Sequence, residues 1–273
     1  MQPAGQSGDS GTARRRSRSP LCSKIPTQTR CVSGRSGKVR FGPFGELVFP
    51  YVEMGAINSL DLLGMDELIL FSFYWANRFR YRKVVDFGAN IGLHSTILHK
   101  CGYKVRCFEP DPVHLKLLER TFALNDVNVE IHKSAVSFEN GELEFVRVLG
   151  NTTGSHLSGA KPNLYGELER FKVPVEAAQP HLQWADLAKI DIEGHEAELI
   201  CALPAEIWLS TDAVLEVGRA ENAKAIYDYL SGTGVNLFSQ KNGWQSVKSV
   251  EDVPTSHREG SLFLTGKSEM PWN

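Results

Sequence analysis

Between residues 83 and 217 the chain alternates short, β-branched apolar segments with stretches of helical periodicity, and this alternation restricts the fold more than any other feature. Parallel strands joined by helices need right-handed crossovers that cover both faces of a sheet. The pattern therefore predicts a doubly wound, Rossmann-like α/β fold with a seven-stranded, mostly parallel sheet and an antiparallel strand at its edge. We expect strands at 83–87, 104–108, 128–132, 187–192, 213–217, 235–238 and 261–264, and helices at 60–78, 93–101, 112–125, 196–201 and 220–230.

Two segments depart from this alternation. Residues 142–175 alternate in polarity at first and then become polar and glycine-rich, which predicts a flap inserted between the third and fourth parallel strands. No clear helix lies between Phe238 and Ser261, so the last strands are expected to form an antiparallel hairpin. Upstream, residues 41–82 are expected to form a hairpin and a helix that pack on the main domain of residues 83–273.

The first 40 residues differ in composition from the rest of the chain. They hold nine Lys and Arg against one acidic residue, which leaves 21 basic and 31 acidic residues in the remainder. Because this segment has few large apolar side chains, it cannot bury enough surface to offset the entropy of ordering the chain. We therefore expect residues 1–40 to be a disordered basic tail. A targeting segment and a nucleic-acid-binding arm are the alternatives, although we expect no nucleic-acid partner.

Cysteine usage and hydropathy suggest a compartment. The chain has five cysteines, an odd number with no pair at metal-ligand spacing, so we predict neither disulfides nor a bound metal. A reducing, cytoplasmic location fits this pattern best. The longest apolar stretch, residues 68–76, is too short for a transmembrane segment.

A glycine-rich turn, Asp86 to Gly92, follows the first predicted strand. Glycines at such a turn let a ligand approach the backbone closely. The spacing of Gly88 and Gly92 does not match the G-x-G-x-x-G pattern of dinucleotide sites. The carboxylate of Asp86 would repel a pyrophosphate and attract a cation, which favours S-adenosylmethionine as the ligand. The simpler alternative is that Asp86 only caps the turn.

Glu109 ends the second predicted strand, 17 residues after Gly92. An acid at this position in a doubly wound sheet accepts hydrogen bonds from ribose hydroxyls. Pro110 then ends the strand, and Asp111 is expected to cap the helix that follows. The alternative is that the three residues form only a turn and a cap.

A third group of ionisable residues ends the predicted strand at 187–192. By alternation, Asp191 and Glu193 would point to the same side, at the edge where parallel strands line a ligand crevice. A hydroxyl acceptor must lose its proton during methyl transfer, and His195 is the candidate base because its ordinary pKa suits neutral pH. Asp191 and Glu193 would orient the substrate or hold a cation, but a single histidine at this place predicts no metal.

Four segments together resemble the FkbM-type family of class I S-adenosylmethionine-dependent methyltransferases. They are VVDFGANIGLHS at 84–95, CFEPDP at 107–112, KSAVS at 133–137 and KIDIEGHEAELI at 189–200. The resemblance covers about residues 84–217 and implies a class I methyltransferase domain within residues 83–273. It implies O-methylation, often of a sugar hydroxyl in a glycolipid, polysaccharide or natural product.

The resemblance also assigns residues. The family's cofactor pattern falls on Asp86, Gly88, Asn90, Gly92 and Glu109, with Ser134 and Ala135 beside the adenine; we add Ala89, Pro110 and Asp191 as neighbouring contacts. Residues 151–155 resemble the family's polar loop near the active site. N- or carboxyl-methylation of a small molecule, a nicotinamide-dependent oxidoreductase and a non-catalytic cofactor-binding domain are the alternatives. We expect a small-molecule or carbohydrate acceptor, and the sequence leaves the acceptor's identity and the oligomeric state open.

Overall fold

The computed structural model describes residues 38–161 and 166–272. Nearly all of the predicted tail therefore lies outside the described residues, as does the short stretch 162–165 of the predicted flap. The end of the predicted tail, Val39–Arg40, is not disordered but forms strand β1, which pairs antiparallel with β2 (Glu46–Leu47). The hairpin that was expected within residues 41–82 therefore begins slightly earlier, at Val39.

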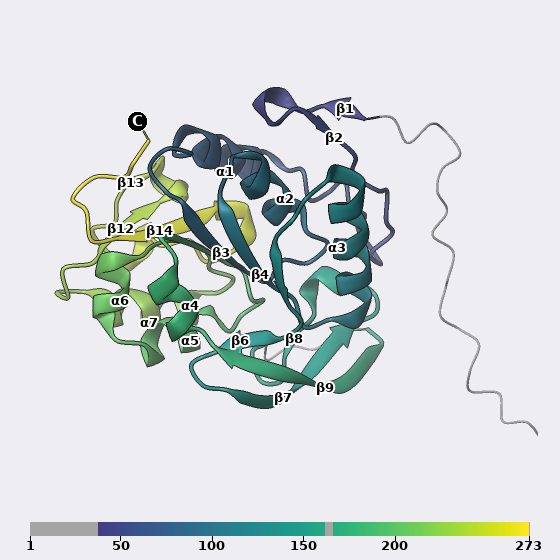
Figure 1. The fold of residues 1–273 in the computed structure, drawn as a ribbon. Coiled ribbons are helices and arrows are strands. Elements are labelled where there is room, and N and C mark those ends of the chain that lie inside the picture. The colour runs from purple at the N-terminus through teal and green to yellow at the C-terminus, as the bar shows by residue number, and fades with distance from the viewer. Residues whose placement is uncertain (1–37, 162–165, 273) are drawn as a thin grey trace, which may run out of the picture. The chain divides into compact units, whose positions relative to one another are not determined.

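A sheet of eight strands lies at the centre of the described chain (Figure 1). Its order is β13-β12-β14-β11-β10-β3-β4-β5, and the five strands from β11 to β5 are parallel. The predicted α/β class with a large, mostly parallel sheet is confirmed. The strands are β3 (Lys83–Phe87), β4 (Lys104–Phe108), β5 (Glu130–His132), β10 (Leu187–Ile190), β11 (Asp212–Glu216), β12 (Asn236–Ser239), β13 (Gln245–Ser246) and β14 (Ser261–Thr265).

The predicted number of seven strands was wrong, whereas the predicted antiparallel strand at the edge is present as β13. Strand β14 runs antiparallel between β11 and β12, so it lies inside the sheet. The short strand β13 pairs with β12 and forms an eighth strand at the edge. The reason is that β12 and β14 are both apolar and buried, and their local pattern does not record which neighbours they pair with.

Helices cover both faces of this sheet. Val84 packs among residues of α1 and α2, whereas Val85 packs among residues of α4 to α7, because successive side chains of a strand point to opposite faces. Helix α3 packs on Cys107, on the same face as α2. The helices are α1 (Met65–Ala76), α2 (Leu93–Lys100), α3 (Pro112–Asn125), α4 (Gln179–Trp184), α5 (Glu196–Ala202), α6 (Ala205–Ser210) and α7 (Ala220–Leu230).

The helix bounds differ from the prediction where side chains compete with the backbone. Helix α1 begins at Met65 and not at residue 60, because a turn precedes it in which Asp61 Oδ2 accepts from the Asn58 amide at 2.7 Å. Helices α4 and α6 were not predicted, since six residues are too few to show a helical period. Single 3₁₀ turns lie at Gly42–Phe44, Thr152–Gly154, Gln240–Asn242, Val250–Asp252 and His257–Glu259.

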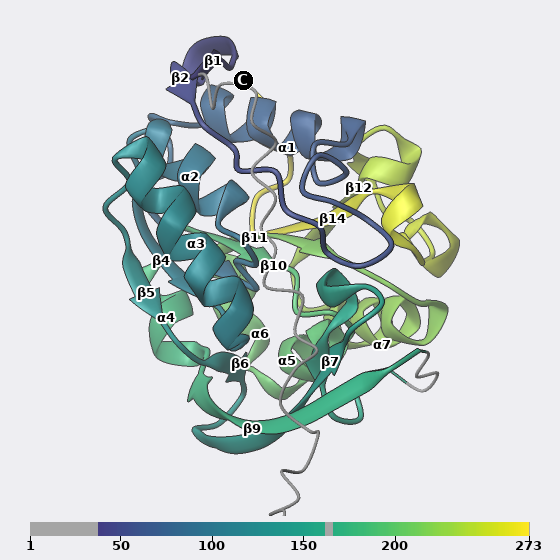
Figure 2. The same ribbon diagram turned by 90° about the vertical axis from the view of Figure 1, so that its right-hand side faces the viewer.

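The predicted flap is part of a second sheet of four strands, with the order β6-β9-β7-β8. The strands are β6 (Ala135–Ser137), β7 (Gly141–Val148), β8 (His156–Leu157) and β9 (Leu168–Ala177). Figures 1 and 2 show this sheet beside the ends of the main strands. Among the described residues, no helix is long and apolar enough to cross a membrane.

Candidate active site

A pocket lies between the carboxyl ends of the main strands and the second sheet. Its empty space amounts to about 570 Å³ when the open solvent at its mouth is counted. The turns after β3, β4 and β10 form one side, and residues around β7 and β8 form the other. Its wall contains Gly88, Asn90, Phe108, Glu109, Pro110, His114, Ser134, Ala135, Val136, Phe145, Thr152, Thr153, Ser155, His156, Leu157, Asp191, Ile192 and Glu193.

Gly88 brings two of these turns into backbone contact. Its φ is +80°, and a Cβ at this position would lie 1.8 Å from the carbonyl oxygen of Asp191. No residue with a side chain fits there without moving a turn. Asn90 also has a positive φ of 51°, and its Oδ1 is buried without a hydrogen-bond partner among the described residues. An acceptor that lacks a donor in a pocket wall is a place for a ligand N–H or O–H.

Glu109 is held by the backbone on both of its carboxylate oxygens. The amide of Asn90 donates to Oε2 at 2.8 Å, and the amide of Asp111 donates to Oε1 at 2.9 Å. Each oxygen retains a free lone pair, so the carboxylate can accept two further hydrogen bonds. His114 lies 3.7 Å from Oε1; burial alone would lower the pKa of this imidazole, but Glu109 raises it overall.

Asp86 lies behind the glycine turn and not in the pocket wall. It is fully buried, and Ser95 Oγ donates to its Oδ2 at 2.6 Å. Lys189 Nζ lies 3.3 Å from Asp86 Oδ1 and donates to the Gly88 carbonyl at 2.9 Å. The charge of Asp86 is therefore balanced within the protein. Two other predicted cofactor residues, Ala89 and Gly92, are likewise absent from the wall.

Asp191 and Glu193 both line the pocket, but not through strand alternation. Strand β10 ends at Ile190, and Glu193 has a φ of 57°. Burial and then the nearby Asp191 raise the pKa of Glu193 to about 7, although Lys161 opposes this shift. Lys161 Nζ lies 2.5 Å from Glu193 Oε2, which makes a partly exposed ion pair at this end of the pocket.

The structure does not bring His195 to these carboxylates. Its ring is buried at the start of α5 and is not part of the pocket wall. Nε2 lies 3.0 Å from Ser137 Oγ, and Nδ1 lies 3.1 Å from a carboxylate oxygen of Glu198. Burial lowers the pKa of His195. Both ring nitrogens therefore have partners inside the protein.

His156, which the sequence analysis did not single out, lines the pocket instead. Its Nδ1 lies 2.9 Å from the carbonyl oxygen of Gly154, and only a protonated Nδ1 can donate to that acceptor. Its Nε2 is buried and has no partner among the described residues. Burial lowers the pKa of His156, so the ring is neutral near pH 7 with a free lone pair on Nε2. The sequence feature that could have pointed to His156 is the polar loop at 151–155, which ends one residue before this histidine.

Comparison with known proteins adds the family. The profile of the methyltransferase FkbM domain matches residues 86–231, more than half of the chain. The chain belongs to the FkbM methyltransferase family. The match contains the turns after β3, β4 and β10, and the whole of the pocket wall. This membership favours a methyltransferase over the nicotinamide-dependent oxidoreductase that the sequence had left as an alternative.

This FkbM protein is similar to one curated methyltransferase and, more distantly, to solved structures. Methyltransferase sdnD from Sordaria araneosa is 30% identical over 198 residues, which cover 59% of this chain and 76% of the relative. A SAM-dependent methyltransferase from Agrobacterium tumefaciens has a TM-score of 0.44 and 9% identity, over 85% of this chain and 70% of that one. A ribosomal protein L11 methylase from Lactobacillus delbrueckii subsp. bulgaricus has a TM-score of 0.36 and 14% identity, over 63% and 70% of the two chains.

Proposed function

We propose that this protein is an S-adenosylmethionine-dependent O-methyltransferase with His156 as the general base. The observation that carries the proposal is His156, which lies in the wall of the pocket that Glu109 also lines and whose buried Nε2 has no partner among the described residues. The proposal retains the hydroxyl acceptor that the sequence suggested and moves the role of base from His195 to His156.

The residues present fit the cofactor. The two oriented oxygens of Glu109 match the two ribose hydroxyls, and Gly88 lies in the same pocket wall. The orphaned Oδ1 of Asn90 is an acceptor for the ammonium group of the methionine part. Phe108 and Ala135 offer an apolar surface for the adenine. Asp86 lies behind the wall and pairs with Lys189. Lys189 in turn donates a hydrogen bond to the carbonyl of Gly88.

When bound, S-adenosylmethionine supplies an electrophilic methyl group on a positively charged sulfur. Carboxylates of Asp191 and Glu193 in the wall favour a cation at this place. The cofactor would supply this methyl group to the acceptor oxygen, and the electron pair of the broken carbon–sulfur bond would remain on sulfur. The hydroxyl proton passes to Nε2 of His156, and Gly154 stabilises the resulting imidazolium through Nδ1–H.

His156 is connected to the acidic end of the pocket through the chain around it. Lys161 Nζ lies 3.5 Å from the carbonyl of Gly154, the same oxygen that accepts from His156, and also pairs with Glu193. A Cβ on Gly194 would lie 2.9 Å from the carbonyl of Ala160, so this loop packs on the turn after β10. The base and the carboxylates therefore belong to one contact network.

The polarity of the wall favours a hydroxylated acceptor. Thr152, Thr153 and Ser155 present hydroxyls, and the Lys161–Glu193 pair offers both a donor and acceptors. A carboxylate acceptor would be repelled by Asp191 and would need no base, so O-methylation of a hydroxyl is preferred over carboxyl methylation. A sugar or another polyhydroxylated small molecule is the acceptor class that we propose.

The test compares His156→Gln with His195→Gln. Methyl transfer from labelled S-adenosylmethionine is first screened against sugars and other polyhydroxylated molecules. We expect His156→Gln to lower kcat by about 10²- to 10⁴-fold, the usual contribution of a general base. Affinity for S-adenosylhomocysteine, measured by calorimetry, should change less than about twofold because the base does not hold the cofactor.

His195→Gln is the matched control, because it removes a buried histidine outside the pocket wall. It should lower thermal stability and leave kcat near that of the parent. A kcat of His156→Gln close to the parent value would contradict the proposal. A large loss in a folded His195→Gln protein would return the role of base to His195.

A further inference from the structure

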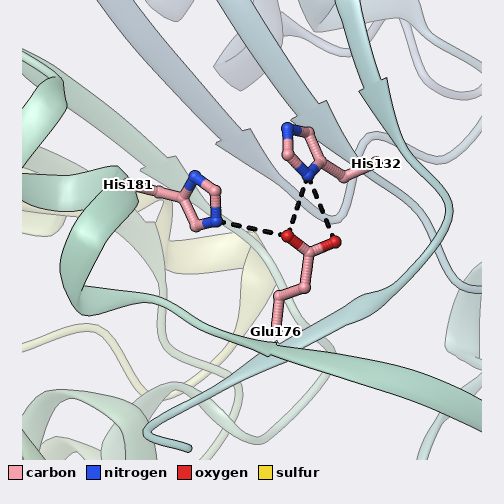
Figure 3. Close-up of side chains that lie close together, drawn as sticks. All are labelled: His132, Glu176 and His181. Atoms are coloured by element: carbon pink, nitrogen blue, oxygen red, sulfur yellow. Dashed lines mark hydrogen bonds and ion pairs between the residues drawn. The ribbon is translucent and has the colours of Figure 1, made fainter. Parts of the chain in front are cut away.

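Three side chains from three different elements meet behind the pocket wall. They are His132 at the end of β5, Glu176 near the end of β9, and His181 in α4 (Figure 3). His132 Nδ1 lies 2.9 Å from Glu176 Oε2, and His181 Nε2 lies 3.3 Å from the same oxygen. Figure 3 shows both imidazole rings directing a nitrogen towards the carboxylate. One ligand atom from each residue lies within 4.8 Å of the other two.

The outer contacts of this cluster fix its orientation. Glu130 Oε1 lies 3.0 Å from His132 Nε2, and Arg106 Nε in turn donates to Glu130 Oε2 at 3.0 Å. Ser134 Oγ donates to Glu176 Oε1 at 2.6 Å. A histidine that donates its far N–H to a carboxylate keeps a lone pair on the near nitrogen, which is the arrangement found around metal-bound histidines.

A proton on Nε2 alone would create an unsatisfied contact in the middle of the cluster. With its proton on Nε2, His132 presents a lone pair on Nδ1 to a carboxylate oxygen 2.9 Å away. Two acceptors at this distance repel each other unless a cation or a second proton lies between them. A positive charge at the point where the three side chains converge would therefore stabilise this arrangement.

We propose that His132, Glu176 and His181 bind a divalent transition-metal ion, with Zn²⁺ as the best match. Two imidazole nitrogens and one carboxylate oxygen are a donor set that zinc prefers, and a water molecule would complete the coordination. Metal–ligand bonds of about 2.0–2.1 Å in a tetrahedron separate the ligand atoms by about 3.3 Å. The separations of 2.9 and 3.3 Å from the carboxylate are close to this value.

The ion would join the second sheet to the main sheet, because its ligands come from β5, β9 and α4. It would also stiffen the pocket. Phe108, in the pocket wall, stacks on His132 with ring centroids 4.2 Å apart and contacts His181 at 4.7 Å. Ser134, also in the wall, holds Glu176. The site is separate from Asp191 and Glu193, where the sequence analysis had considered a cation.

No metal was expected from the sequence, because the ligands of this cluster are far apart along the chain. His132 and Glu176 are 44 residues apart and lie on strands of different sheets. Their side chains are partly exposed, 17% for His132, 35% for Glu176 and 14% for His181, which leaves a route for an ion to enter.

The experiment uses the full-length protein stripped with a chelator and titrated with Zn²⁺. Calorimetry should show one ion per chain bound at the site, and the melting temperature should rise with Zn²⁺ concentration. His132→Gln, Glu176→Gln and His181→Gln should each weaken binding at least tenfold, and Glu130→Gln should weaken it about tenfold through the orientation of His132. His99→Gln, which changes a partly exposed histidine of α2, is the control and should bind like the parent.

A second measurement does not depend on the variants. Co²⁺ bound to the parent should give the visible absorption of a four-coordinate site with nitrogen and oxygen ligands, without a thiolate charge-transfer band. Absence of saturable Zn²⁺ binding would overturn the proposal and leave a protonated hydrogen-bond network in its place. Binding that all three ligand variants retain, or a thiolate band, would overturn it in favour of ligands elsewhere in the chain.

Discussion

Lys189 Nζ lies 3.3 Å from Asp86 Oδ1, and both side chains are withdrawn from solvent directly behind the pocket. Burial alone would lower the pKa of Lys189, but Asp86 and Asp191 raise it overall, so the ammonium remains charged. One cation thus neutralises the strand-end carboxylate and holds the carbonyl of Gly88. Asp86 therefore contributes to the charge balance of this interior and is not part of the pocket wall.

Removal of this cation should destabilise the fold strongly. In Lys189→Met, Asp86 is left as a buried charge without its partner, which costs about 3–5 kcal/mol. Urea unfolding followed by circular dichroism measures the change. The double variant Asp86→Asn/Lys189→Met should recover a large part of the loss, because no uncompensated charge remains. A loss below about 1 kcal/mol in the single variant would show that the pair is not essential.

Gly88→Ala should separate the turns after β3 and β10. The new Cβ would lie 1.8 Å from the carbonyl oxygen of Asp191, in addition to the strain of a φ of +80°. Gly102→Ala is the matched control, since its φ is +90° but no atom lies within 4 Å of the added Cβ. Backbone strain alone should lower the free energy of unfolding of this control by about 1–2 kcal/mol.

Gly88→Ala should lower the free energy of unfolding by more than Gly102→Ala does. It should also weaken binding of S-adenosylhomocysteine at least tenfold, whereas Gly102→Ala should bind this molecule as the parent does. Thermal unfolding and calorimetry give the two readouts. Equal stability and equal affinity of the two variants would mean that the contact between the turns is not required.

Arg147 should be a principal tie between the second sheet and α3. It donates from Nη2 and Nε to the two oxygens of Asp111, at 2.5 and 2.7 Å, and Asp111 itself is fully buried and caps α3. Arg147→Met should lower the free energy of unfolding by about 3–5 kcal/mol, because it leaves the Asp111 carboxylate without its ion-pair partner in the interior. Chemical denaturation provides the measurement.

Arg170→Met tests whether the burial of the pair decides the effect. Arg170 donates to Glu144 at 2.7 Å, but the two side chains are 42% and 44% exposed. Arg170→Met should lower the free energy of unfolding by less than about 1 kcal/mol, as for other surface ion pairs. Similar losses in the two variants would argue against the special role of Arg147.

Glu216 should make the stability of the protein fall as pH rises. Burial and then Asp191, Glu193, Glu196 and Glu67 raise its pKa to about 9. The folded state therefore keeps a proton that the unfolded state loses, and the penalty grows from about pH 4.5, the ordinary value for this group, to about pH 9.

Glu216→Gln removes this penalty, so its melting temperature relative to the parent should increase steadily from pH 5 to pH 9. Glu206→Gln, which removes a charge from the exposed surface of α6, is the control. A difference between Glu216→Gln and the parent that is the same at every pH would contradict the raised pKa.

Several elements could be predicted from local sequence alone. The strands β3 and β4 and the helices α3 and α7 have the predicted bounds, because each has a strong period and a clear boundary. The Asp111-Pro112 pair, for example, combines a side-chain cap with a residue suited to the first helical turn. Short elements such as α4 and β13 carry too little pattern to be recognised.

The sequence by itself determined the α/β class and the places where the turns after β3, β4 and β10 present Gly88, Glu109 and Asp191. Hydrophobic periods and glycine spacings act over a few residues, and this information is local. Only the tertiary structure decided that Asp86 forms an ion pair with Lys189. The same is true of the hydrogen bond between His195 and Ser137, and of the place of His156 in the pocket wall. These contacts depend on the strand order and on how the second sheet packs beside the first, because packing brings together residues that no local pattern connects.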